Sequence, residues 1–144
     1  MRILSIDLGD VRTGLAICDP GEMLASPLRV ITQRNRDKLA DEIAAIAVAE
    51  GAGIIVLGHP INMNGTLGTR SELVQAFAAL LAGHTDLPIE LCDERATTVS
   101  AHQILNTTDV RGKKRGAVVD AVAAVLILET YLGKRKSQRE RGGE

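Results

Sequence analysis

The chain has 144 residues and a net charge of -1, with 45% apolar and 24% charged residues, which is the composition of one soluble globular domain. The longest stretch without a formal charge, residues 51–69, contains five glycines and a proline, which excludes a membrane span. The acidic residue at position 7 precedes any long apolar run, which excludes a secretory signal. We therefore expect a cytoplasmic protein with no membrane partner.

Three extended segments are expected first. Residues 3–6 form a short apolar run that ends at Asp7, and residues 14–18 form a second run across a turn, so the two predict a hairpin. Residues 24–31 form the third segment. Cys18 and Cys92 lie in apolar runs without metal-ligand spacing, so we expect both to be reduced and buried.

Helices and strands alternate in the rest of the chain. Residues 37–50 have the apolar spacing of one helical face, and 54–57 form a β-branched run typical of a strand buried on both faces. Thr69 to Glu72 match a capping box, and we expect the apolar face of the helix that follows to consist of Leu73, Ala76, Phe77, Leu80 and Leu81. The remaining elements expected are a strand at 88–92 and helices at 98–106 and 116–132.

This order predicts an α/β fold with a mixed sheet and helices on both faces, because a strand meander precedes right-handed βαβ crossovers. We expect one domain over residues 1–133. Residues 134–144 lack an apolar face and are expected to be a basic, disordered tail. Reactive groups in such sheets gather beyond the carboxyl ends of the parallel strands, here at Asp7, Gly58 and Asp93 with Glu94.

Three carboxylates are the candidate metal ligands. Asp7 and Glu94 follow two strands whose ends are expected to converge, and Asp120 is the sole charge in the run GAVVDAVAAVLIL. Carboxylates close together repel one another unless a cation joins them, and an unpaired carboxylate in an apolar run needs a partner. Oxygen ligands without a His or Cys cluster favour Mg²⁺ or Mn²⁺. Each carboxylate taken alone is more often a cap or a surface group; the three together favour a metal site.

Five motifs in order resemble the YqgF-type family of Holliday-junction-resolvase-like proteins, also called pre-16S rRNA nucleases, within the RNase H-like superfamily. The resemblance covers residues 1 to about 133. The motifs are Asp7-Leu8-Gly9 with Arg12 and Gly14, the ASPL segment at 25–28, the loop from Gly58 to Gly65, the DERATT segment at 93–98, and a basic stretch at 111–115 leading into 119–124.

The resemblance implies an RNase H-like, five-stranded mixed sheet of order 3-2-1-4-5. It matches Asp7, Glu94 and Asp120 to the family's acidic catalytic positions. Bound Mg²⁺ or Mn²⁺ ions would activate water and stabilise the leaving oxygen of a phosphodiester. The expected function is 5′ processing of pre-16S rRNA in ribosome biogenesis, a phosphodiester hydrolase activity (EC 3.1.-.-), with resolution of DNA Holliday junctions as the alternative.

Structured RNA or branched DNA is the expected partner. Residues 107–144 contain 9 basic and 5 acidic residues, whereas residues 1–106 contain 8 basic and 13 acidic residues. On charge alone, a solvated surface with a frayed basic tail is the more common explanation of this asymmetry. The candidate nucleic-acid contacts are Arg12, Asn62, Asn64, Arg95, Arg111, Lys113, Lys114 and Arg115. The stretch Arg111 to Arg115 is expected to be a loop before the last helix.

Alternatives remain at several positions. The 58–68 loop also fits a plain connection between a strand and a helix, and Arg95 also fits neutralisation of its acidic neighbours. Asp10 and His59 depart from the family pattern: Asp10 adds an anion that either tightens metal binding or weakens phosphate binding, and His59 is expected to be a hydrogen-bonded bystander.

Two other classes of protein compete with a nuclease. An actin-like ATPase shares this element order but needs two such domains, and a binding module without catalysis needs no acidic triad. The sequence leaves both the choice between RNA and DNA and the choice between monomer and homodimer open.

Overall fold

The protein is seen in a computed structural model that describes residues 1–60, 69–93 and 112–141, with the backbone alone described at 69, 112–120 and 140–141. Five strands form one sheet in the order β3-β2-β1-β4-β5. They are β1 (Arg2–Asp7), β2 (Arg12–Cys18), β3 (Ala25–Thr32), β4 (Ala52–His59) and β5 (Ile89–Asp93). Strands β1, β4 and β5 are parallel, and β2 and β3 add antiparallel pairs, so the predicted mixed sheet and its strand order are confirmed.

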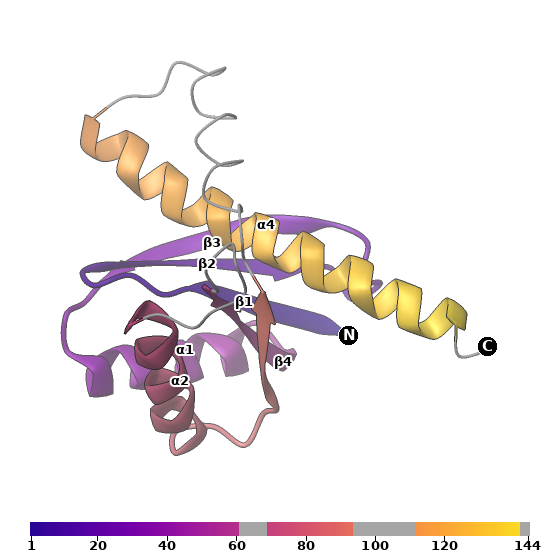
Figure 1. The fold of residues 1–144 in the computed structure, drawn as a ribbon, viewed down its shortest axis with the longest axis horizontal. Coiled ribbons are helices and arrows are strands. Elements are labelled where there is room, and N and C mark those ends of the chain that lie inside the picture. Colours follow the sequence, from indigo (N-terminus) through magenta and orange to yellow (C-terminus); the bar gives the residue numbers. More distant parts are fainter. Residues whose placement is uncertain (61–68, 94–111, 142–144) are drawn as a thin grey trace.

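Helices cover both faces of the sheet, as predicted (Figure 1). Helices α1 (Arg36–Ala49) and α2 (Thr69–Ala82) lie on one face, and α4 (Gly112–Arg141) crosses the other. The central strand β1 alternates between the two faces. Leu4 and Ile6 pack in the core beneath α1 and α2, whereas Ile3 packs in the core beneath α4.

Local sequence explains the bounds of α1. The Asn35 side chain accepts a hydrogen bond from the backbone N–H of Lys38 (3.0 Å), which caps the first turn. The helix stops before Gly51, whose φ of 69° lies in the left-handed region that glycine adopts without strain. Leu39, Ile43 and Ala47 are buried on this helix at the spacing of one helical face.

The apolar face predicted for α2 was wrong in part. Phe77 and Leu81 are buried as expected, but Leu73 is 46% exposed, and the buried residue in that turn is Val74. The buried face of α2 consists of Ser71, Val74, Phe77 and Leu81, so it differs from the predicted face at the N-terminal end of the helix. The buried Ser71 hydroxyl there lies 2.5 Å from the Nε2 atom of His59 at the end of β4. The predicted capping box involves the Thr69 side chain, which lies outside the described residues. The helix predicted at 98–106 also lies outside them.

The last helix is longer than predicted at both ends. The prediction was 116–132, followed by a disordered tail from 134, but α4 runs from Gly112 to Arg141. The apolar stripe of α4, formed by Ala124, Ile127, Leu128 and Tyr131, packs against the sheet and against Cys18 and Cys92, which are buried and form no disulfide. Burial raises the pKa of the Cys18 thiol. None of the helices in the described parts of the chain combines the length and the apolar character needed to cross a membrane.

An ion cluster around Glu22 explains why the tail is helical. Arg135 donates two hydrogen bonds to the Glu22 carboxylate (2.8 and 3.2 Å), and Arg139 and the N-terminal amine each lie 3.3 Å from it. The Glu22 side chain is only 8% exposed, so these cations compensate a carboxylate that is largely withdrawn from water. The hydrogen bond from Arg135, together with the N-terminal ammonium group, lowers the pKa of Glu22 to about 2.

We predict that this cluster makes stability depend on pH. A carboxylate with a lowered pKa stabilises the fold above its ordinary pKa of 4.5, and this contribution is lost as the pH falls towards 2. Glu22→Gln is expected to cost about 2 kcal/mol at pH 7, and the difference from wild type should shrink between pH 4.5 and 2. Urea unfolding across this range measures it. Glu129→Gln, on the exposed face of α4, is the matched control; an equal loss in the two variants would contradict the prediction.

Candidate metal and nucleic-acid site

Helix α4 runs antiparallel to the parallel strands, and three contacts fix its direction. The Ser5 hydroxyl donates to the Ala124 carbonyl (2.7 Å), the Cys92 thiol lies 4.0 Å from the Ile127 carbonyl, and the Tyr131 hydroxyl donates to the Glu90 carboxylate (2.5 Å). Burial and the Glu90 carboxylate raise the pKa of Tyr131 to about 12, so the phenol remains a donor at neutral pH. The N-terminal end of α4 therefore lies at the carboxyl edge of β1, β4 and β5.

Asp7 and position 120 lie at the same level of this edge. Ile3 and Ser5 face α4, so strand alternation places Asp7 on that face as well. Asp7 is two residues, or about 6.6 Å, beyond Ser5. Position 120 is one helical turn, or about 6 Å, before Ala124, on the same stripe of α4. The structure thus brings two of the three predicted catalytic positions to one place; the side chain of Asp120 lies outside the described residues.

Asp93 belongs to the other face of the sheet. Glu90 and Cys92 of β5 contact α4, so Asp93 alternates to the side of α1 and α2. Its register partner His59 lies on that side too, with its Nε2 atom 2.5 Å from the Ser71 hydroxyl. Gln75 donates to the same hydroxyl (3.0 Å). His59 is hydrogen bonded, as expected, and Glu94 lies outside the described residues.

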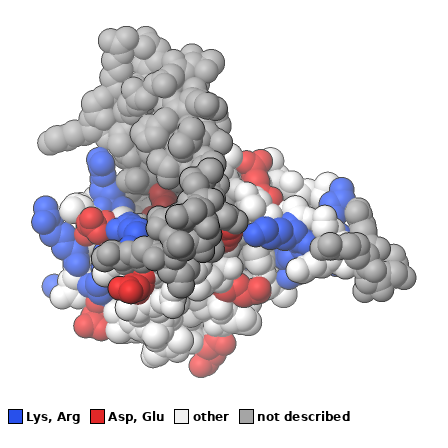
Figure 2. Space-filling view, in the orientation of Figure 1, with Lys and Arg blue, Asp and Glu red and all other residues white. Residues whose placement is uncertain are grey.

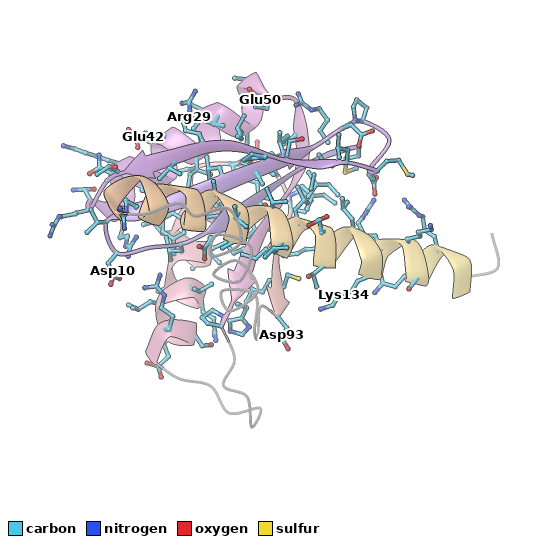
Figure 3. All side chains as sticks on the ribbon, turned by 90° about the horizontal axis from the view of Figure 1, so that it is seen from above. Asp10, Arg29, Glu42, Glu50, Asp93 and Lys134 are labelled. Atoms are coloured by element: carbon cyan, nitrogen blue, oxygen red, sulfur yellow. The ribbon has the colours of Figure 1, made fainter. Side chains whose placement is uncertain are left out.

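The segment that follows Asp7 is held by two arginines. Arg70 donates to the Leu8 carbonyl and to the Asp10 carboxylate (2.9 Å). Arg36 donates to the Gly9 carbonyl (2.9 Å), and its guanidinium lies 3.8 Å from Asp10. The charge of Asp10 is thus matched by two cations, which argues against the expected effects on metal or phosphate binding. Figure 3 shows Asp10 towards the N-terminal end of α4 and Lys134 towards its C-terminal end.

The predicted nucleic-acid residues fall into two groups. Arg12 begins β2 at the carboxyl edge, and Lys113, Lys114 and Arg115 are in the first turn of α4, not in a loop as predicted. Sequence criteria placed the helix start too late because cations oppose the helix dipole at an N-terminus. Asn62, Asn64, Arg95 and Arg111 lie outside the described residues. The sequence analysis missed Arg36 and Arg70, because no local motif links either residue to residues 8–10. Arg70, for example, is 60 residues from Asp10 in the chain.

The donor set at this edge fits a hard divalent cation. Asp7 and Asp120 are carboxylates, and Mg²⁺ and Mn²⁺ prefer oxygen ligands. No group of three His, Cys, Asp or Glu side chains is found among the described residues, a set that includes neither the Glu94 nor the Asp120 side chain. The fit therefore rests on the chemistry of the donors and on the backbone positions of residues 7 and 120.

Comparison with known proteins gives both family and fold. Residues 1–134 match the family described as "RuvX: Holliday junction resolvase". A relative from Pelotomaculum thermopropionicum, named "Putative pre-16S rRNA nuclease", is 42% identical over 100% of this chain and 95% of its own length. A relative of the same name from Symbiobacterium thermophilum is 40% identical, over 96% of each chain.

Two solved resolvases have a similar fold. Thermus thermophilus RuvC, in complex with a Holliday junction substrate, has a TM-score of 0.58 at 12% identity and covers 91% of this chain and 94% of its own. The fowlpox virus Holliday junction resolvase has a TM-score of 0.56 at 13% identity, over 93% of this chain and 99% of its own. At these identities the likeness concerns the fold alone, and it confirms the predicted RNase H-like architecture.

We predict that Gly9→Ala disturbs the segment after Asp7. An added Cβ would lie 1.8 Å from the backbone oxygen of Arg12, a contact that only a backbone shift relieves. The expected cost is roughly 1–3 kcal/mol of unfolding free energy. Gly133→Ala is the matched control, because nothing lies within 4 Å of its Cβ and alanine favours a helix interior. Thermal unfolding measures both, and a tolerated Gly9→Ala would show that the segment adapts freely.

Proposed function

Because the chain belongs to the RuvX family of Holliday junction resolvases, we propose that it is a divalent-metal-dependent endonuclease that hydrolyses phosphodiester bonds of structured nucleic acid. The observation that carries this proposal is the meeting of Asp7 with position 120 of α4 at the carboxyl edge of the sheet. This is where α/β sheets place their reactive groups. Sequence identity of 36–42% to curated nucleases supports the same activity.

Asp7, Glu94 and Asp120 are the proposed metal ligands. A divalent ion bound there would supply an activated water and stabilise the charge on the leaving oxygen. Asp7 ends the central strand, which pairs with β2 up to Asp7 and with β4 up to Ile6, so the sheet supports this ligand from its N-terminal side. The alternation of β5 argues against Asp93 as a ligand, because Asp93 lies on the face of the sheet opposite α4. Glu94 is therefore the proposed ligand of the two neighbours.

Substrate phosphates would meet a positive edge. Lys113, Lys114 and Arg115 add three charges to the N-terminal end of α4, where the helix dipole is also positive. Arg12 begins β2 at the same edge. Figure 2 shows Lys and Arg side chains gathered at the end of the molecule that Figure 1 shows to hold the β1–β2 turn. Such contacts bind the nucleic-acid backbone and give little base specificity.

The proposed substrate is the 5′ region of pre-16S rRNA, cut in the cytoplasm during ribosome biogenesis. The names of the curated relatives support RNA, whereas the solved neighbours bind DNA junctions, which makes Holliday junction resolution the second candidate. Both candidate substrates are structured polyanions. An edge that recognises the shape and the backbone of a nucleic acid would bind either of them. The protein acts as a monomer or a homodimer in this proposal.

We predict that loss of one ligand charge abolishes cleavage without unfolding the protein. Asp7→Asn, Glu94→Gln and Asp120→Asn each keep the side-chain volume and should lower kcat by at least about 100-fold with Mg²⁺. Asp93→Asn is the matched control and should lower the melting temperature more than the rate. Cleavage of labelled pre-16S rRNA and junction DNA measures both substrates. Wild-type rates in Asp7→Asn and Asp120→Asn would refute the metal site.

We predict a separate role for the first turn of α4. Replacing Lys113, Lys114 and Arg115 by Ala should weaken nucleic-acid binding and reduce its salt dependence, because fewer counterions are displaced. Mn²⁺ affinity should change little. The control replaces Lys134 and Lys136, at the other end of the same helix. If the first-turn variant has the salt slope of wild type, this turn does not contact the substrate.

A further inference from the structure

We propose that Arg36 and Arg70 are positioning residues that hold the Asp7 carboxylate in place for metal binding, acting through residues 8–10. This proposal rests on the proposed function, because it concerns the same metal site. Neither arginine belongs to the motifs that predicted the site. Both come from helices on the face of the sheet opposite α4, so they reach the segment from behind the proposed ligands.

The two arginines bind three consecutive residues. Arg70 contacts Leu8 and Asp10, and Arg36 contacts Gly9 and Asp10. Two of these acceptors are backbone carbonyls, so the contacts restrain the path of the chain in addition to pairing the Asp10 charge. Hydrogen bonds from a charged donor are stronger than neutral ones, and the planar guanidinium fixes their direction.

The segment needs such support because it leaves the sheet directly after Asp7. The register of β1 with β2 ends at the pair of Asp7 and Gly14, and β1 pairs with β4 only as far as Ile6. Beyond that point, Gly9 donates to the Thr13 hydroxyl (3.3 Å) and packs closely against Arg12. A ligand at the last residue of a strand keeps its geometry only if the residues after it are held.

The side chains of Arg36 and Arg70 are partly buried, and that of Arg36 also contacts an aromatic ring. The Arg36 guanidinium lies 6.0 Å from the centre of the Phe77 ring, which is buried at 3% exposure. Their side chains are 31% and 38% exposed, far less than the 78% of Asp10. A cation that waits for a substrate phosphate would be expected to direct its donors outward. These two direct them to the protein's own carbonyls.

The experiment compares Arg36→Met and Arg70→Met with Arg34→Met in the full-length protein. Arg34 is exposed at the same edge and provides the same charge, so it controls for general attraction of polyanions. Hydrogen exchange at the amides of residues 8–11 and binding of Mn²⁺ alone are measured. We expect both Met variants of Arg36 and Arg70 to exchange faster and to bind Mn²⁺ about tenfold more weakly, with kcat lowered more than KM is raised. Arg34→Met should leave both the exchange and the Mn²⁺ affinity at the wild-type level.

Two further variants sharpen the result. Asp10→Ala keeps both carbonyl contacts and should have a smaller effect than either arginine variant, and Arg70→Lys should restore part of the Mn²⁺ affinity if Arg70→Met unfolds. Unchanged exchange and Mn²⁺ affinity in the Arg36 and Arg70 variants, or equal losses in Arg34→Met, would overturn the proposal. If the wild-type protein neither binds Mn²⁺ nor cuts nucleic acid, the proposed function fails, whereas the exchange of residues 8–11 still decides whether the arginines order the segment.

Discussion

The buried hydrogen bond from Ser5 to the Ala124 carbonyl sets the register between the central strand and the long helix. Ser5 has no exposed surface, and a buried hydroxyl without a partner costs about 1–3 kcal/mol, so this pairing disfavours any sliding of α4 along β1. Sliding of α4 by one helical turn would move position 120 by about 5 Å along the helix axis, away from its place beside Asp7. The relative placement of two proposed ligands therefore depends on a contact that has no part in the chemistry itself.

Charge is arranged differently at the two ends of α4. At the C-terminal end, Glu22 binds Arg135, Arg139 and the N-terminal amine, so the cations there are used in folding. At the N-terminal end, the first turn contains no acidic residue to offset its cations. One helix thus has an end that Arg135 and Arg139 fasten to the β2–β3 turn through Glu22, and another end whose cations lie beside the proposed ligands. A net charge of -1 conceals both groups of cations.

Hydrophobic period and glycine position were enough to predict the strands and the mixed sheet, because a strand buried on both faces, such as 54–57, is a continuous apolar run. The strand order came from the family resemblance. The ends of α4 were not predictable in this way. Its start contradicts the helix dipole rule, and its last turns are held by Glu22, which is more than 100 residues distant in the chain. Arg36 and Arg70 were not predictable for the same reason. A sequence motif identifies residues that are close together in the chain, whereas the contacts of these two arginines with residues 8–10 form only when the chain folds.

The position of Asp10 links these electrostatic features to the choice of function. An extra anion beside a metal edge would oppose an approaching phosphate if it acted at full strength. Arg36 and Arg70 offset it within the protein, so Asp10 does not cancel the positive charges that the proposed substrate would meet at the first turn of α4. An actin-like ATPase would also tolerate this balance, but residues 1–134 match the RuvX family of Holliday junction resolvases. With a strand-end carboxylate and a positive helix end at the same carboxyl edge, the described part of the chain suits a polyanion that binds along this edge.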